Sequence, residues 1–160
     1  LLTDSFNKSY SPWLMSQLTK PNLDRDIKIV RSTYLYFFVV TILAFLLHLL
    51  SPWILFLVGQ KFRDTGVFLI YIAMGYAFGG MYYMVTNYIF FTGKTGYLAA
   101  ITFFSGIVNV SLSYILIKSG GLTGAAQAFM LSHALLFLGT WFIAHRLHPM
   151  PWGKAILPRI

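Results

Sequence analysis

Cysteine is absent from this chain of 160 residues, and Asp and Glu together number only four. Without cysteine there is no disulfide framework, no thiolate nucleophile and no cysteine zinc site. The scarce acidic residues provide no paired carboxylates for acid and base catalysis, and no cluster typical of a metal site is present. We therefore expect no enzymatic activity, no metal and no other cofactor.

Charged residues are also scarce, at 10% of the chain, whereas ordinary soluble domains have about a quarter. Hydrophobic residues make up 58% and occur in long blocks instead of amphipathic stripes. This composition is typical of a membrane protein. The net charge of +8 comes from scattered Lys and Arg without a stripe of stacking aromatics, so we expect no nucleic-acid partner.

Four stretches of the sequence lack every Asp, Glu, Lys and Arg, and they are residues 32–60, 65–93, 95–117 and 119–145. Each exceeds the roughly 20 residues that a helix needs to cross about 30 Å of hydrocarbon. A β-barrel is disfavoured because segments such as 41–47 do not alternate in polarity. The sequence predicts an all-α, polytopic membrane protein with a bundle of four transmembrane helices in residues 32–146.

Basic residues are distributed unequally between the two expected sides of the membrane. Short connections make neighbouring spans antiparallel, which puts nine cations on one side and three on the other. The first set is Lys8, Lys20, Arg25, Lys28, Arg31, Lys94, Arg146, Lys154 and Arg159, and the second is Lys61, Arg63 and Lys118. Because cytoplasmic loops are enriched in Lys and Arg, we expect both ends of the chain to be cytoplasmic.

The two ends of the chain differ from its apolar centre. Residues 1–31 are expected to form the end of a preceding span or an interfacial helix, followed by a cytoplasmic linker. Residues 147–160 contain three prolines and are expected to form a basic cytoplasmic tail on the surface, with Trp152 as a headgroup anchor. Since the chain begins at Leu1 and not at methionine, we expect a fragment of a longer protein.

Small residues recur at intervals of four in the second span and at the start of the fourth. They are Gly75 and Gly79, and Gly120, Gly124, Ala128 and Ser132. Helices in lipid associate by close packing, so such spacing predicts tight contacts between helices. The contact is either a static packing seam or a sliding seam used in alternating access.

Polar residues inside the spans are the candidates for a substrate pathway. Ser105, Asn109 and Ser113 form one stripe along the third span, Tyr83 and Asn87 lie in the second, and His48 lies in the first. Such groups must face neighbouring helices or a wet cavity. Alternatively, these polar residues only form hydrogen bonds between helices and do not line a substrate pathway. His48 and His133 have no carboxylate in any span with which to relay protons.

Several short features occur in a recognisable order along the chain: Pro12, the segment 23–26, the segments 51–54 and 58–62, the segment 92–95, Asn109 and the segment 121–126. In this order and spacing, residues 10–146 resemble the multidrug/oligosaccharidyl-lipid/polysaccharide superfamily. The resemblance is greatest to its O-antigen and exopolysaccharide flippases.

The resemblance implies a two-lobed transporter with about twelve to fourteen helices, of which this chain supplies part of the C-terminal lobe. It implies flipping of an undecaprenyl-diphosphate-linked oligosaccharide across the cell inner membrane by alternating access, for cell-surface polysaccharide biosynthesis. The partners would be the bilayer, the lipid-linked sugar and the remaining spans. The sequence departs from the family's cationic cavity, since no span contains Lys or Arg.

Four alternatives stay open. A cation-coupled multidrug exporter would need acidic residues in further spans, and a peptidoglycan-precursor flippase would share the same architecture. A membrane glycosyltransferase or sugar polymerase would need catalytic loops, and the loops here are short. A structural four-helix subunit would need a start codon immediately before Leu1.

Overall fold

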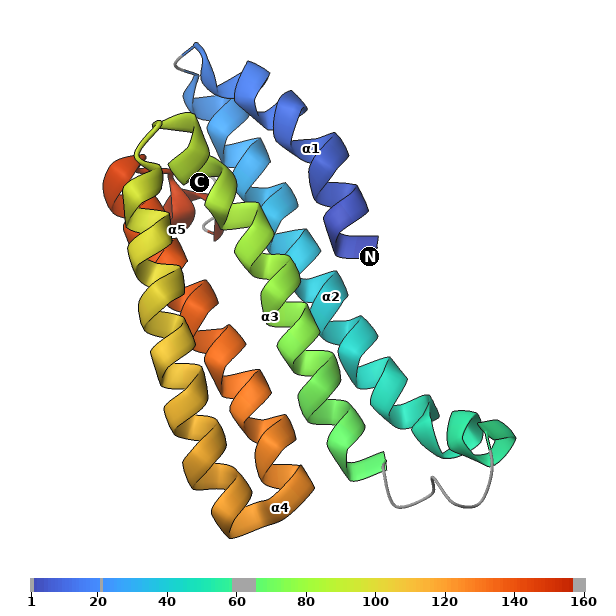
Figure 1. Cartoon of the computed structure of the whole chain (residues 1–160). Coiled ribbons are helices and arrows are strands. Elements are labelled where there is room, and N and C mark those ends of the chain that lie inside the picture. Colours follow the sequence, from blue (N-terminus) through green and yellow to red (C-terminus); the bar gives the residue numbers. More distant parts are fainter. Residues whose placement is uncertain (1, 21, 59–65, 157–160) are drawn as a thin grey trace.

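The computed structural model describes residues 2–20, 22–58 and 66–156, and these residues contain five helices and no β-strand. The helices are α1 (Leu2–Leu18), α2 (Leu23–Val58), α3 (Gly66–Phe91), α4 (Thr95–Leu147) and α5 (Trp152–Ile156). Figure 1 shows the long helices side by side in one bundle, with α4 folded back on itself. The predicted all-α class is confirmed.

Three helices are long and apolar enough to cross a membrane, namely Leu23–Trp53 within α2, all of α3 and all of α4. A lipid bilayer offers the backbone no hydrogen-bond partners, so a chain of this composition satisfies its amide groups inside helices. The structure therefore has the character of a multi-pass membrane protein.

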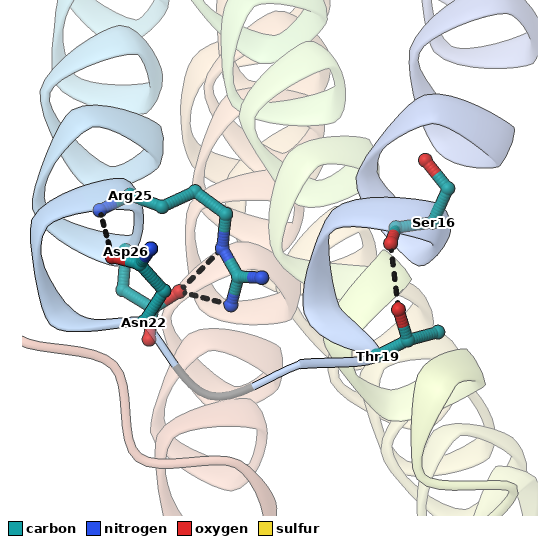
Figure 2. Close-up of polar contacts among 5 residues, drawn as sticks. All are labelled: Ser16, Thr19, Asn22, Arg25 and Asp26. Carbon is teal, nitrogen blue, oxygen red and sulfur yellow. Dashed lines mark hydrogen bonds and ion pairs between the residues drawn. The ribbon is translucent and has the colours of Figure 1, made fainter.

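The turn between α1 and α2 combines local caps at two helix ends (Figure 2). The hydroxyl of Thr19 donates to the carbonyl of Ser16 at 2.8 Å. The side-chain oxygen of Asn22 accepts from the backbone amide of Arg25 at 3.0 Å, which caps the start of α2. Arg25 also forms an ion pair with Asp26 at 2.7 Å. These contacts fix the start of α2 well before the predicted apolar stretch.

Gly121 divides α4 into two antiparallel parts, which we call the first arm (residues 95–120) and the second arm (residues 122–147). Its φ of 56° and ψ of −131° are not helical. This region of backbone space is almost exclusive to glycine because a side chain would clash there. The predicted stretches 95–117 and 119–145 correspond closely to these two arms, which lie side by side in Figure 1.

Helix α3 lies at the centre of the bundle and contacts α1, α2 and α4. It contributes much of the core through Met81, Met84, Val85 and Ile89, each at most 6% exposed. By contrast, residues 45–50 of α2 are all exposed. The bundle is therefore closely packed toward the α1–α2 turn and more open toward the opposite end.

The C-terminal segment is not the surface tail that the sequence predicted, as far as it is described. Met150 and Ala155 are only 4% and 7% exposed. The carbonyl of Ala155 accepts from Nε of Arg31 at 3.2 Å, and the carbonyl of Trp152 accepts from the Tyr34 hydroxyl at 3.4 Å. The segment packs because its apolar side chains meet aromatic residues of the bundle, a pairing that basic and proline-rich composition does not reveal.

The basic residues gather at one end of the bundle, where Figure 1 shows the α1–α2 turn, the α3–α4 turn and α5. This end carries Lys20, Arg25, Lys28, Arg31, Lys94, Arg146 and Lys154. The opposite end, at the kink of α4, carries Lys118. Lys8 lies within α1, where it pairs with Asp4. The remaining topology residues Lys61, Arg63 and Arg159, and the family-like residues Gly59 to Phe62, lie outside the described residues.

Candidate functional site

The two arms of α4 pack in a regular antiparallel register. A Cβ added to Gly124 would collide with the backbone carbonyl of Leu116, and one added to Gly139 would lie 3.7 Å from Ile101. Ser105 shares a groove with Leu135. In each of these pairs the two residue numbers add up to 240, so one antiparallel register runs along both arms. In this register Asn109 lies opposite residue 131 and Ser113 lies opposite residue 127.

The predicted polar stripe lies on the inner face of this hairpin. Half-buried positions of the first arm recur at spacings of three and four, and they include Leu98, Ile101, Ser105, Leu112 and Leu116. Asn109 and Ser113 are half-buried on the same face. The stripe is therefore turned toward the second arm instead of away from the bundle.

Asn109 is halfway along the first arm, and among the described residues its side chain makes no hydrogen bond. By comparison, the hydroxyls of Thr102 and Ser111 on the same arm donate to the carbonyls of Leu98 and Ile107 at 2.8 and 3.0 Å. A carboxamide has two N–H donors and a carbonyl acceptor, and leaving them unpaired in an apolar medium costs several kcal/mol. Asn109 therefore needs water or a polar group beyond the described residues.

Tyr83 and Asn87 face a different neighbour, helix α1. The Asn87 side chain is 2% exposed, and its Nδ2 donates to Oδ1 of Asn7 at 2.8 Å. Tyr83 lies within electrostatic reach of Lys8, which pairs with Asp4 at 2.9 Å. These two candidates serve a contact between helices in the structure, away from the hairpin stripe.

The two histidines inside spans have different surroundings. His48 is exposed, in the open part of α2. His133 is half-buried, with Nδ1 2.9 Å from the carbonyl of Phe129 and its ring centroid 4.2 Å from the Phe129 ring. The six pathway candidates are thus spread over three places: the hairpin stripe, the α1–α3 contact and the open part of α2.

Gly75 and Gly79 of α3 form a seam with the second arm. A Cβ at Gly75 would overlap the Phe129 ring, and one at Gly79 would lie 3.5 Å from His133. Ala128 is fully buried, and the buried Ser132 donates its hydroxyl to the carbonyl of Ala128 at 2.7 Å. Gly120 lies outside this seam, since a Cβ there would meet no described heavy atom within 4 Å.

A cluster of polar and aromatic groups lies at the basic end of the bundle and was not predicted from the sequence. The buried hydroxyls of Tyr10 and Tyr88 both lie near the buried Thr33 side chain, but neither makes a hydrogen bond of good geometry among the described residues. The His148 ring stacks on Tyr88 at 6.0 Å, and burial lowers the pKa of this imidazole. Buried unpaired hydroxyls are usual sites for ordered water. No signal in the sequence links Tyr10, Tyr88 and His148, which come from three separate segments.

An open groove of about 1060 Å³ lies between α3 and the first arm. The polar side chains in its lining are Tyr82, Thr95, Thr102 and Ser111, and the other lining residues are apolar. Among the described residues, no group of three or more His, Cys, Asp or Glu could hold a metal ion. The geometry suits contact with an amphipathic molecule or a further helix.

Comparison with known protein families, with curated proteins and with solved structures finds no match to this chain.

Proposed function

We propose that this chain is a four-span module of a membrane transporter, with α2, α3 and the two arms of α4 as its spans. At 1.5 Å per residue each arm of the 53-residue α4 is roughly 39 Å long. That length exceeds the roughly 30 Å of the hydrocarbon layer. The basic end of the bundle lies in the cytoplasm, in agreement with the enrichment of Lys and Arg in cytoplasmic loops.

The transporter is a flippase for lipid-linked oligosaccharide in the cell inner membrane, and this module belongs to its C-terminal lobe. The family-like order of motifs from Pro12 to Ala126 supports this assignment. The substrate, an undecaprenyl-diphosphate-linked sugar, is amphipathic and needs a pathway with both polar and apolar lining. The remaining spans supply the cations that bind its diphosphate, since the apolar stretches 32–60, 65–93, 95–117 and 119–145 contain none.

The unpaired side chain of Asn109 is the observation that carries the proposal. A purely structural bundle surrounded by lipid would bury or pair a carboxamide at mid-span. A helix that borders a hydrated pathway keeps such a group in contact with water or substrate. Asn109 therefore marks the first arm of α4 as a wall of the pathway.

Residues 1–160 contain no cysteine, so single cysteines introduced there report the topology once any cysteine outside this range has been replaced. Lys94→Cys and Ser119→Cys lie at opposite ends of the first arm. A membrane-impermeant maleimide added to intact cells is expected to label Ser119→Cys at once and Lys94→Cys only after permeabilisation. The reverse labelling, or labelling of both from outside, would contradict the four-span arrangement.

The transport test uses the full-length protein in proteoliposomes that carry lipid-linked oligosaccharide, with a glycosidase added outside to detect sugars that cross. We expect flipping above that of empty vesicles, loss of flipping in Asn109→Leu, and near-normal flipping in Asn109→Gln. Ile115→Leu, an exposed position of the same arm outside both the stripe and the groove, is the control. Export of a cationic dye without sugar flipping would instead favour the cation-coupled exporter.

A further inference from the structure

A second groove lies between the second arm of α4 and the segment that forms α5. Its volume is about 580 Å³. Leu138, Trp141, Phe142 and His145 line it from the arm, and residues 150–154 line it from the other side. The packed C-terminal segment, which the sequence does not predict, creates this groove.

The floor of the groove is aromatic and its outer side is apolar. The rings of Trp141 and Trp152 lie 5.1 Å apart at an interplanar angle of 73°. Leu138 and Phe142 are 53% and 61% exposed, so an apolar strip continues from the groove along the second arm. Such a strip, directed into the hydrocarbon layer, offers a surface to an acyl chain.

The rim of the groove is positively charged. Lys154 lines it directly, and the Arg146 guanidinium lies 5.0 Å above the ring of Phe142. None of the lining residues is acidic. Two of the four acidic residues of the chain, Asp4 and Asp26, form ion pairs in other parts of the bundle. The rim therefore carries positive charge, and no carboxylate is among the residues that line the groove.

We propose that this groove binds an anionic phospholipid of the bilayer. Its phosphate lies beside Lys154 and Arg146 at the basic end of the bundle, and one acyl chain follows Phe142 and Leu138. Basic pockets at the cytoplasmic surface of membrane helices recognise anionic headgroups in this way. Bound lipid would hold α5 against the second arm. The inference depends on the membrane location of the chain and not on the transported substrate.

Tryptophan fluorescence offers a direct test, because two of the four tryptophans line the groove. Trp13→Phe and Trp53→Phe remove the other two, which are 47% and 73% exposed. The full-length protein, with every tryptophan outside residues 1–160 also replaced by phenylalanine, is placed in phosphatidylcholine vesicles. It is titrated with brominated phosphatidylglycerol or brominated phosphatidylcholine. We expect half-maximal quenching at a mole fraction about five-fold or more lower for the anionic lipid.

Two variants test the contributions of the charged rim and of the apolar floor separately. Lys154→Gln should raise the required fraction of anionic lipid about five-fold, the usual effect of one cation near an anionic surface. Lys94→Gln, at the same end but outside the groove, is the matched control. Gly153→Leu fills the groove without changing charge, since a Cβ there meets no described heavy atom within 4 Å, and it should abolish the preference.

Equal quenching by both lipids would overturn the proposal. So would an effect of Lys94→Gln as large as that of Lys154→Gln, because it would reveal a diffuse surface charge and no site. Loss of the lipid preference on adding inorganic phosphate would also overturn it, since it would indicate a simple anion site. Because quenching is measured without transport, a failure of the flippase assay leaves this result interpretable.

Discussion

The hairpin of α4 should tolerate alanine at Gly120 and reject it at Gly124, four residues away. At Gly120 a Cβ meets no described heavy atom within 4 Å. At Gly124 it would overlap the carbonyl carbon and oxygen of Leu116 and lie 3.0 Å from the amide nitrogen of Ile117. The first arm must therefore move if Gly124 becomes alanine, whereas nothing must move at Gly120.

Two opposing contributions determine how much each substitution changes the free energy of unfolding. Replacing a helical glycine by alanine stabilises a helix by about 0.5–1 kcal/mol at either position. Overpacking costs about 1–3 kcal/mol, and we expect the upper end because a backbone carbonyl cannot rotate away as a side chain can. Gly124→Ala should then lose about 2 kcal/mol of unfolding free energy, and Gly120→Ala should gain up to about 1 kcal/mol.

Thermal unfolding of the two variants in the same detergent provides the assay. For a chain of 160 residues, 1 kcal/mol corresponds to about 2–4 °C in Tm, so the variants should differ by roughly 6–12 °C. Equal Tm values would refute the close contact of the arms at Gly124. A lower Tm for Gly120→Ala than for Gly124→Ala would refute the register of the hairpin.

Three further outcomes are expected. Gly75→Ala should lower the unfolding free energy by about 1–2 kcal/mol, because its Cβ overlaps the Phe129 ring, and Phe129→Leu should restore most of it. A double-mutant cycle of Asn7→Ala and Asn87→Ala should give a coupling of about 0.6–1.7 kcal/mol, the usual range for hydrogen bonds between membrane helices. Burial lowers the pKa of His148 in the folded protein. As pH falls below about 6.5, His148 therefore binds a proton in the unfolded chain before it does so in the folded one, and this destabilises the fold. Tm should therefore decrease between pH 7.5 and 5.5, and less so in His148→Phe.

A specific result would contradict each of these three predictions. No rescue of Gly75→Ala by Phe129→Leu would mean that the ring is not the obstacle. A coupling near zero in the asparagine cycle would remove the contact between α1 and α3. A Tm of His148→Phe that falls with pH as steeply as that of the parent protein would assign the pH dependence to other groups.

The helices were largely predictable because uncharged stretches of this length have few alternatives in lipid. Residues 95–117 and 119–145 correspond closely to the two arms, and the glycines at 120 and 121 indicated the break. The uncharged stretch that begins at residue 32 marks only the apolar part of α2, whereas the helix itself begins at Leu23. Charged residues mark where a helix leaves the apolar layer, and α2 extends beyond that point with Asn22 as its cap.

Which helix faces meet was not predictable. Asn87 and Asn109 look equivalent as polar residues inside spans, yet Asn87 pairs with Asn7 of α1 and Asn109 turns toward the second arm. The place of α1 depends on tertiary packing that periodicity does not encode. The docked position of Trp152 was missed for a similar reason, because an aromatic residue near a span end is equally compatible with a headgroup anchor.

The backbone of Gly121 determines how far α4 extends. As an uninterrupted straight helix, its 53 residues would measure about 80 Å, which is well over twice the roughly 30 Å of a hydrocarbon layer. Half of that rod would have to project into water with its apolar side chains uncovered. An L-residue at position 121 would favour this straight form, and a D-residue, which prefers positive φ, would preserve the reversal. The positive φ of Gly121 is therefore the backbone feature that lets α4 fold back on itself.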